Sequence, residues 1–287
     1  MIVKGCPKIS IVTTNYNGAK YLEETIQSVL NQTFKNVEYI IIDGGSTDGS
    51  QEIIEKYEEQ LAYWESKKDR GFAHAYNKGF SKTTGDILAY LNSDDLYCPW
   101  AFEIVARCFI DLPEIEWLTS LFPMLHSNRH GFVYINPAQP FNKALYYAGF
   151  YGRKLGFIQQ ESTFWTRRLW KKSGSYFDEN LDYAIDAELW ARFFQHADLY
   201  AVSTTLGGFR YRSDSKSGLH LNKYCDEMFA ILKKYKKDAA NLSGVKSINR
   251  IVKLFPLRTG NITYYGKVVK WDLKSEKYFA EDTQIIY

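Results

Sequence analysis

Two adjacent carboxylates, Asp94 and Asp95, are the residues of this sequence whose types and spacing most directly suggest chemistry. They follow the apolar run 87–91 in a short polar segment that ends at Pro99. Neighbouring negative charges repel each other unless a cation or hydrogen-bond donors lie between them. Mg²⁺ and Mn²⁺ prefer oxygen ligands and leave coordination positions for phosphate oxygens. The pair predicts a divalent metal site, and one aspartate acting as the N-cap of the next helix explains it equally well.

Asp43 ends an earlier apolar run, 37–43, and opens the glycine-containing turn 44–49. Its carboxylate could accept hydrogen bonds from a nucleobase N–H or a ribose hydroxyl, and the glycines would let the backbone approach a nucleotide closely. Aspartate is also common in turns for purely local reasons. The turn lacks the Gly-Lys-Ser/Thr of a phosphate-binding P-loop, and no GxGxxG fingerprint follows the first apolar run.

Arg70 and Asp186 complete the set of candidate functional residues. Arg70 could give bidentate hydrogen bonds to a diphosphate, or it could be a solvated surface side chain. Asp186 precedes the apolar stretch 187–194 and could act as a general base or as a helix N-cap. The five histidines form no HxH or HExxH cluster, and no GxSxG elbow is present. A zinc enzyme and a serine hydrolase are therefore not expected.

The elements that position these residues alternate between strand and helix over the first hundred residues. Strands are predicted at 9–14, 37–43, 61–64 and 87–91, with amphipathic helices between them. Ligands of such sheets bind outside the carboxyl ends of the strands, which places 15–17, 43–46, 69–71 and 93–95 around one site. Further along, helices are predicted at 100–111 and 187–194, and strands at 116–122, 162–166, 199–202 and 206–211. The stretch 126–151 has no regular pattern, and the tail carries basic amphipathic stretches within 221–237 and 245–255.

Composition limits the classes of protein that remain. The chain has 287 residues, 45% apolar and 24% charged, with a net charge of +3, which is too balanced to indicate nucleic-acid binding. Four scattered cysteines fit free thiols in a reducing compartment. The first residues lack the apolar core of a signal peptide, and no run is long enough to span a membrane. We expect a cytoplasmic protein whose basic segment 221–287 could make peripheral contact with the inner face of a membrane.

Six segments together carry a resemblance to a known family. They are ISIVTTNYN, IIDGGSTDGS, ESKKDRGFAHAYNKGF, TTGDILAYLNSDDLY, QQESTFWTRRLW and LDYAIDAELWARF, and they occur in this order within residues 8–217. In this the chain resembles the family 2 glycosyltransferases. The resemblance implies an α/β GT-A fold with a Rossmann-like mixed central sheet flanked by helices and a helical C-terminal extension. It divides the chain into a nucleotide-sugar-binding half, 1–105, an acceptor-binding half, 106–220, and the extension, 221–287.

The resemblance also implies a role for each matching residue. Thr14 and Tyr16 would contact the base, Asp43 would read a pyrimidine or ribose, Arg70 would approach the nucleotide, Asp94 would lie near the ribose, Asp95 would bind the metal, Asp186 would be the catalytic base, and Gln160 and Trp165 would border the acceptor. Arg212, which departs from the family pattern, could instead balance the charge of the leaving diphosphate. The implied reaction transfers a sugar, with inversion, from a UDP- or dTDP-linked donor to a glycan or lipid-linked acceptor in cell-surface polysaccharide synthesis. Mg²⁺ or Mn²⁺ would be the cofactor.

Two departures from the family pattern bear on these roles. Lys67 stands in the segment Ser66–Asp69 where an acidic residue is common. Arg212 stands where a histidine can complete the metal site, and a permanently cationic guanidinium cannot ligate a metal. Asp214 and His220 are nearby substitutes, between which the sequence does not choose. A nucleotidyltransferase on a related fold and a non-catalytic nucleotide- or glycan-binding scaffold remain as alternatives.

Overall fold

The protein is described by a computed structural model that covers residues 5–127, 131–135, 140–152, 155–212, 215–239 and 264–285. The first part alternates as the sequence predicts. Its elements are β1 (Ile9–Asn15), α1 (Ala19–Leu30), β2 (Val37–Asp43), α2 (Ser50–Glu55), the 3₁₀ turn Glu58–Gln60, β3 (Tyr63–Ser66), α3 (Phe72–Phe80), β4 (Ile87–Asn92), β5 (Leu96–Tyr97) and α4 (Ala101–Asp111). Strands β1, β2, β3 and β4 pair in parallel, as expected for βαβ units.

The second part is less regular. It consists of β6 (Trp117–Ser120), β7 (Met124–Ser127), β8 (Gly131–Ile135), α5 (Lys143–Tyr147), the 3₁₀ turn Gln160–Ser162, β9 (Phe164–Thr166), α6 (Arg167–Lys172), α7 (Ile185–Phe193), β10 (Tyr200–Val202), β11 (Gly207–Arg210), α8 (Lys216–Ala239), β12 (Tyr264–Asp272) and β13 (Lys277–Ile285). The strands and helices predicted between residues 116 and 237 are confirmed. β7, β8 and α5 lie in the stretch 126–151 or at its border, where the sequence shows no pattern.

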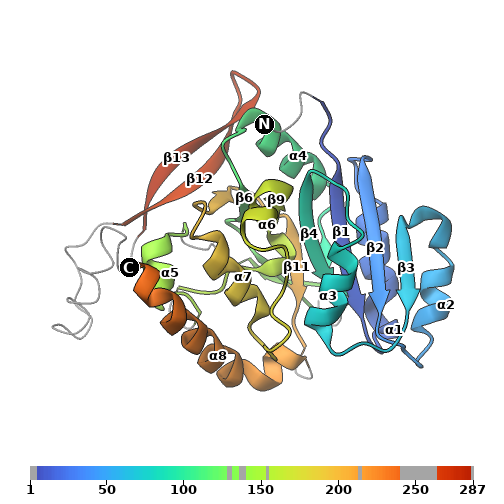
Figure 1. The fold of residues 1–287 in the computed structure, drawn as a ribbon. Coiled ribbons are helices and arrows are strands. Elements are labelled where there is room, and N and C mark those ends of the chain that lie inside the picture. Colours follow the sequence, from blue (N-terminus) through green and yellow to red (C-terminus); the bar gives the residue numbers. More distant parts are fainter. Residues whose placement is uncertain are drawn as a thin grey trace.

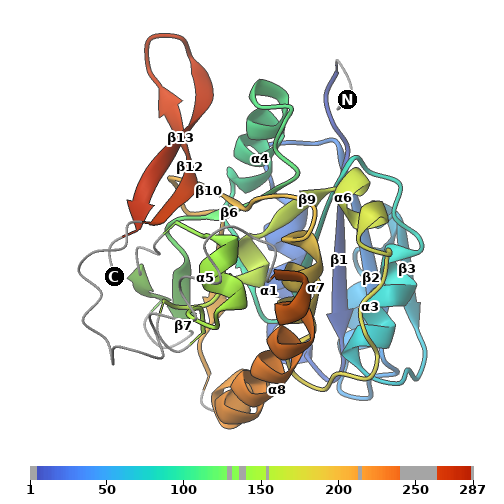
Figure 2. The same ribbon diagram turned by 60° about the vertical axis from the view of Figure 1, so that its left-hand side comes forward.

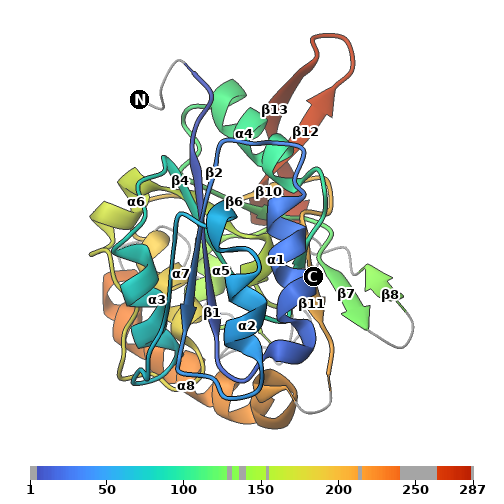
Figure 3. The same cartoon turned by 90° about the vertical axis from the view of Figure 1, so that its right-hand side faces the viewer.

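The strands of the described residues form two sheets. The larger is mixed and nine-stranded, in the order β13-β12-β10-β6-β9-β4-β1-β2-β3, and the smaller has the order β5-β11-β7-β8. β9 runs antiparallel between β4 and β6 and so joins the two halves of the large sheet. Helices lie on both of its faces: α3, α6 and α7 are on one side and α1, α2 and α4 on the other (Figures 1 and 3). This confirms the predicted mixed α/β class.

The core has two apolar layers because successive strand residues point to opposite faces of the sheet. Ile40 and Ile42 of β2 pack in the layer beneath α3 and α7, whereas Tyr39 and Ile41 pack in the layer beneath α1 and α4. All four side chains are buried. Strand β2 is therefore buried on both faces, which explains why its sequence is nearly continuously apolar.

The C-terminal extension is helical only in its first part. Residues 264–285 form the antiparallel hairpin β12–β13, and β12 pairs in parallel with β10 at the edge of the large sheet (Figure 2). The expectation of an all-helical extension is wrong here, because the buried Val268 and Val269 suit a strand that covers the exposed edge of β10. The helix predicted at 245–255 lies outside the described residues.

Two further expectations concern thiols and membranes. Cys6, Cys98, Cys108 and Cys225 are all free in the structure, as the sequence predicts. Within the described part of the chain, no helix is both long and apolar enough to cross a bilayer.

Candidate active site

The carboxyl ends of β1, β2 and β4 lie side by side, as the βαβ pattern requires. The strand register pairs Asn15 with Asp43 and Thr14 with Asn92. The loops that follow are in close contact: a Cβ atom on Gly18 would collide with Asn15 and would lie 2.8 Å from Ser93 Oγ. The predicted convergence of these loops at one edge of the sheet is confirmed.

Asp43 lies beneath the surface at this edge, within a set of hydrogen-bond donors. Its carboxylate accepts bonds from Asn15 Nδ2 (2.7 Å), Ser46 Oγ (2.5 Å), Ser66 Oγ (2.6 Å) and the backbone N–H groups of Gly45 (3.1 Å) and Ser46 (2.9 Å). Burial by itself would raise the pKa of Asp43, but these donors outweigh it and hold the pKa below its usual value. Asp43 is thus a buried anion that ties the loops after β1, β2 and β3 together.

The exposed groups above Asp43 come from the same three loops. A Cβ atom on Gly44 would lie 2.9 Å from Asp69 Oδ2 and 3.3 Å from the Tyr16 ring, so these residues converge over the Gly44 backbone. The Tyr16 side chain is 70% exposed, which is unusual for a tyrosine and leaves a face of the ring free to stack on a planar ligand. Asp69 is half-buried and receives the N–H of Gly71 at 2.8 Å.

Asp95 points inward from the loop after β4. Its carboxylate accepts bonds from Asn92 Nδ2 (3.1 Å), Gln160 Nε2 (2.8 Å) and the backbone N–H of Arg210 (2.9 Å), and the residue is fully buried. Burial and the nearby charge of Asp94 raise the pKa of Asp95. Asp95 therefore joins β4, the Gln160–Ser162 turn and β11, and its role as a metal ligand stays a prediction.

Asp94 points outward and pairs with a cation. Arg212 Nη2 lies 2.9 Å from Asp94 Oδ2, and both side chains are about one quarter exposed, at 27% and 23%. Arg210, which is almost fully buried, donates through Nε to the backbone oxygen of Asp94 (2.7 Å) and through Nη2 to Glu24 (2.6 Å). Both guanidinium groups lie over the ring of Tyr21, at 4.6 and 5.1 Å from its centroid. The loop after β4 is thus surrounded by positive charge.

The fit of these residues to a divalent ion can be judged from their contacts. The oxygens of Asp95 are engaged by N–H donors, and Asp94 is the accessible carboxylate. The described residues contain no group of three His, Cys, Asp or Glu side chains that could hold a metal. Asp214 lies outside the described residues, and the ring of His220 packs against Tyr183. These side chains fit a divalent ion that is bound by Asp94 together with phosphate oxygens of the substrate. They do not fit an ion bound by protein ligands alone.

Tyr76 of α3 connects the two halves of the site. Its hydroxyl donates to Asn92 Oδ1 at 2.7 Å. Burial raises the pKa of the Tyr76 phenol, and the carboxylates of Asp95, Asp94 and Asp186 raise it further. All three carboxylates therefore act on one phenol, although they come from distant stretches of the chain.

Asp186 lies in the first turn of α7 and is half-buried. Its Oδ1 accepts the N–H of Ala187 at 2.8 Å, and both of its oxygens accept the hydroxyl of Tyr224, at 3.0 and 3.1 Å. Burial raises the pKa of Asp186 to about 6, against the opposing effect of these hydrogen bonds. A carboxylate with such a pKa is ionised at neutral pH and still able to take up a proton.

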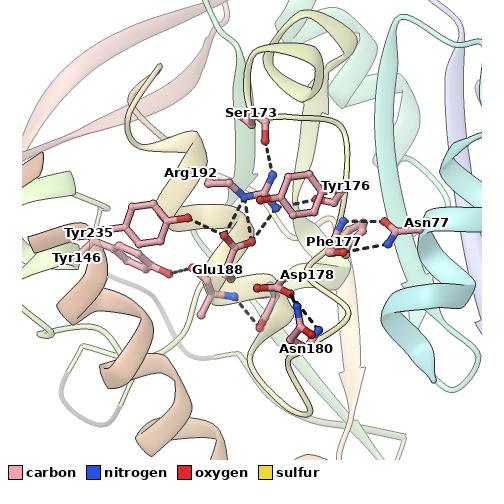
Figure 4. A network of polar contacts seen from close by, with 12 residues as sticks. Asn77, Tyr146, Ser173, Tyr176, Phe177, Asp178, Asn180, Glu188, Arg192 and Tyr235 are labelled. Atoms are coloured by element: carbon pink, nitrogen blue, oxygen red, sulfur yellow. Dashed lines mark hydrogen bonds and ion pairs between the residues drawn. The ribbon is translucent and has the colours of Figure 1, made fainter. Parts of the chain in front are cut away.

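A buried ion pair anchors the helix that carries Asp186 (Figure 4). Arg192 Nη2 lies 2.7 Å from Glu188 Oε2 and also donates to the backbone oxygen of Tyr176 at 2.7 Å. Arg192 Nη1 donates to the backbone oxygen of Ser173, and the hydroxyl of Tyr235 donates to Glu188 Oε1 at 2.7 Å. These bonds fix α7 between the segment after α6 and helix α8.

Arg70 is directed toward the acceptor half. Arg70 Nη2 lies 2.7 Å from Glu179 Oε2, and its side chain is 70% exposed. Asn77 of α3 holds the same segment by exchanging two hydrogen bonds with the backbone of Phe177, at 2.7 and 2.9 Å (Figure 4). Arg70 is thus paired with Glu179, and its place at the mouth of the site and its contact with a nucleotide stay predictions.

The two residues assigned to the acceptor side differ in their surroundings. Gln160 is half-buried and donates to Asp95, and its place beside an acceptor stays a prediction. Trp165 has no exposed surface and packs against Phe80, Trp170 and Phe193 in the core. The expectation that Trp165 borders the acceptor needs correction, because its strand β9 is central in the sheet and both faces are covered.

Sequence reasoning missed three residues of this region: Asp69, Arg210 and Tyr224. Asp69 and Arg210 stand in segments that the resemblance singled out, as the Asp of the Asp-x-Gly segment and as the first arginine of Arg210-Tyr211-Arg212. Those signals could have suggested a role for both. Tyr224 offers no such signal, since it stands in an amphipathic helix among other apolar residues.

Comparison with known proteins agrees with this geometry. Residues 10–164, more than half of the chain, match the family described as Glycosyl transferase family 2, and the chain belongs to this family. It is 28% identical over 236 residues to an uncharacterized glycosyltransferase of Rickettsia prowazekii, covering 81% of this chain and 74% of that one. It is 29% identical to an uncharacterized glycosyltransferase of Rickettsia typhi, covering 68% of this chain and 61% of that one. A shorter match, 38% over 92 residues, links it to the putative teichuronic acid biosynthesis glycosyltransferase TuaG of Bacillus subtilis, over 31% of this chain and 36% of that one.

Solved structures share the fold. TarS of S. aureus superposes with a TM-score of 0.58 at 18% identity, over 86% of this chain and 46% of the TarS chain. Its segment 1–349 has also been solved in complex with UDP-GlcNAc, with a TM-score of 0.58 at 16% identity over 86% and 76% of the two chains. The mannosyltransferase PcManGT from Pyrobaculum calidifontis, in complex with GDP-Man and Mn²⁺, gives 0.54 at 14% identity over 87% and 80%. The fold is therefore GT-A, as the resemblance implied.

Proposed function

We propose that the protein transfers a sugar from a nucleotide diphosphate to an acceptor hydroxyl in a single, inverting displacement. The observation that carries this proposal is the position of Asp186. It is a half-buried carboxylate with a pKa of about 6, and it acts on the same phenol as Asp94 and Asp95. We infer from this shared phenol that Asp186 and the loop carrying Asp94 and Asp95 line one site, as a base and a phosphate-binding loop would.

The donor would occupy the edge formed by the loops after β1, β2 and β4. Tyr16 offers a ring for the base to stack on, Thr14 and Asp69 offer groups for its edge or the ribose, and Asp43 holds the loops beneath. Arg212 and Arg70 would balance the diphosphate. A divalent ion held by Asp94 and the phosphates would stabilise the charge on the leaving group. The UDP-GlcNAc and GDP-Man complexes of the structural neighbours support this class of donor, and we favour UDP or dTDP.

The acceptor would approach from the side of α7. There Asp186 would take the proton of the attacking hydroxyl, a step that typically contributes about 10²–10⁴-fold to the rate. The description of TuaG, a putative teichuronic acid biosynthesis glycosyltransferase, supports a glycan or a lipid-linked glycan of the cell surface as the acceptor class. Such an acceptor would place the protein on the cytoplasmic side of a membrane, with peripheral contact through residues 221–287. Co-sedimentation with anionic liposomes, with and without these residues, tests that contact.

The proposal is tested by donor screening followed by product analysis. UDP, dTDP and GDP, each free and sugar-linked, are screened by thermal shift with and without Mn²⁺. A ligand at one hundred times its Kd stabilises the fold by about 2.7 kcal/mol, which is readily detected. The stabilising nucleotide sugar is then incubated with the protein, and we expect release of the nucleoside diphosphate. Release of pyrophosphate would indicate a nucleotidyltransferase instead, and binding without any turnover would indicate a non-catalytic scaffold.

A further inference from the structure

Helix α8 lies beside α7 (Figure 2). Three of its polar side chains, those of Tyr224, Glu227 and Tyr235, bond to α7 or to the backbone that leads into it. The hydroxyl of Tyr224 donates to the Asp186 carboxylate, at 3.0 Å from Oδ1 and 3.1 Å from Oδ2. One turn further along α8, Glu227 contacts the backbone that leads into α7. Near the end of the described part of α8, Tyr235 bonds to Glu188. The candidate base is therefore held by a helix that follows it by 38 residues in the chain.

Glu227 supplies a cap that α7 lacks. The N-cap residue of α7 is Ala184, which has no side chain that could accept the free N–H groups of the first turn. Glu227 Oε1 accepts the N–H of Asp182 at 3.0 Å, and Oε2 accepts the N–H groups of Tyr183 at 2.8 Å and of Ala184 at 2.6 Å. Three backbone donors converge on one carboxylate, so the entry into α7 is fixed two residues before Asp186.

We propose that α8 is a positioning element of the active site, in which Tyr224 orients the Asp186 carboxylate and Glu227 holds the turn that carries it. This inference rests on the proposed function, since it assumes that Asp186 is the base. Neither residue would touch the substrate. Both act through Asp186, and their contacts determine where its oxygens lie when an acceptor hydroxyl arrives.

Tyr224 and Glu227 shift the pKa of Asp186 in opposite directions. The Tyr224 hydroxyl stabilises the ionised carboxylate and lowers its pKa, whereas the negative charge of Glu227 raises it. Burial, the largest influence, also raises this pKa. The other titratable groups that act electrostatically with Asp186 come from several elements: Tyr76 of α3, Tyr90 of β4, Tyr146 of α5 and Glu161 of the Gln160–Ser162 turn. Burial raises the pKa of each of these four, which disfavours their charged forms.

The test compares Tyr224→Phe with the matched control Tyr235→Phe. Both remove one tyrosine hydroxyl from the same α7–α8 interface, but only Tyr224 contacts Asp186. We measure kcat and KM of donor turnover between pH 5 and 9. For Tyr224→Phe we expect the acid limb of the kcat profile to move up by roughly one pH unit, since a hydrogen bond to a charge is lost. The donor KM stays unchanged. For Tyr235→Phe we expect the acid limb of the kcat profile to lie at the same pH as in the wild type.

A third variant tests the sign of the effect. Glu227→Gln keeps an acceptor near the turn and removes the charge, so the acid limb should move down, opposite to Tyr224→Phe. A general loss of packing would not move the limb in opposite directions. If turnover is too weak in either variant, the ¹³C resonance of the Asp186 carboxyl, assigned by its absence in Asp186→Asn, reports the same titration without catalysis.

The outcomes separate this inference from the proposed function. Identical profiles for Tyr224→Phe and Tyr235→Phe, together with an unchanged ¹³C titration, overturn the positioning role of α8. Full activity of Asp186→Asn would overturn the proposed base and leave the hydrogen bonds of α8 purely structural. Opposite shifts of the limb, with an inactive Asp186→Asn, support both.

Discussion

Asp43 is buried and Asp186 is half-buried, but the surroundings of the two carboxylates shift their pKa values in opposite directions. At the end of β2, Asp43 receives five hydrogen bonds from Asn15, Gly45, Ser46 and Ser66, and its pKa is lowered. In the first turn of α7, Asp186 receives the N–H of Ala187 and the hydroxyl of Tyr224, and its pKa is raised to about 6. The surroundings of Asp43 therefore keep its carboxylate ionised, whereas those of Asp186 allow it to take up and release a proton.

This difference suits Asp43 to a structural role and Asp186 to the role of base that we propose for it. Five donors make protonation of Asp43 costly, so it suits the task of holding three loops in register. The sparse surroundings of Asp186 leave its basicity near neutral pH, where general-base catalysis is most effective. Residue type alone would not separate the two, because both are aspartates at the end of a strand or the start of a helix.

The largest expected effect comes from breaking the donor set around Asp43. Asp43→Asn replaces an acceptor oxygen by an NH₂ group that faces buried donors, and we expect a loss of stability on the order of 3 kcal/mol. Asp186→Asn should instead leave the stability unchanged or raise it, because its ionised form is disfavoured by burial. Urea unfolding of both variants at pH 7.5 measures the difference. Equal losses would remove the contrast between the two sites.

A smaller effect is expected where Arg212 pairs with Asp94. Arg212→Ala removes one cation from the Asp94 carboxylate, and we expect the apparent affinity for Mn²⁺ in the presence of UDP to rise on the order of tenfold. In metal-free buffer the same variant should bind UDP more weakly, since one cation is lost. Calorimetric titration of UDP with and without Mn²⁺ measures both. A metal affinity that does not change would show that Asp94 does not bind the ion.

Glu161 offers a prediction on pH dependence. Its two carboxyl oxygens are buried and have no hydrogen-bond partner within the described part of the chain, and burial raises its pKa well above 4.5. The unfolded chain therefore releases this proton first as the pH rises, and stability is lost by up to about 1.4 kcal/mol per pH unit above pH 4.5 until the folded pKa is reached. Glu161→Gln should match the wild type near pH 4.5 and exceed its stability at pH 7. Thermal melts of the wild type and of Glu161→Gln measure this between pH 4.5 and 7. A difference in stability that does not change with pH would contradict the prediction.

The smallest effect on stability is expected at the exposed pair Arg70–Glu179. Replacing either partner of this ion pair by alanine should change the free energy of unfolding by less than about 1 kcal/mol. The two substitutions should differ in their effect on UDP binding. Arg70→Ala should weaken UDP binding, more so at low salt. Glu179→Ala removes the partner of the Arg70 guanidinium and should not weaken UDP binding. Equal affinities for both variants and the wild type would exclude Arg70 from the donor site.

The sequence predicts the part of the fold that depends on local periodicity. The strands and helices of the first hundred residues, and the alignment of the carboxyl ends of β1, β2 and β4, follow from apolar runs at regular intervals. The burial of Asp43 and Asp95 does not follow, because it depends on donors such as Ser66 and Arg210, the latter 115 residues from Asp95. The hairpin β12–β13 was also missed, since its strands respond to the open edge of β10 and not to a pattern of their own.

The central claim, that Asp186 is the base of a sugar transfer, is tested most directly by following donor turnover by NMR in the wild type and in Asp186→Asn. The wild type should release the nucleoside diphosphate and a sugar that first appears with inverted anomeric configuration. Asp186→Asn should bind the same donor with unchanged affinity and turn it over at least about 100-fold more slowly. Equal rates in the two proteins, or a sugar released with retained configuration, would contradict the account.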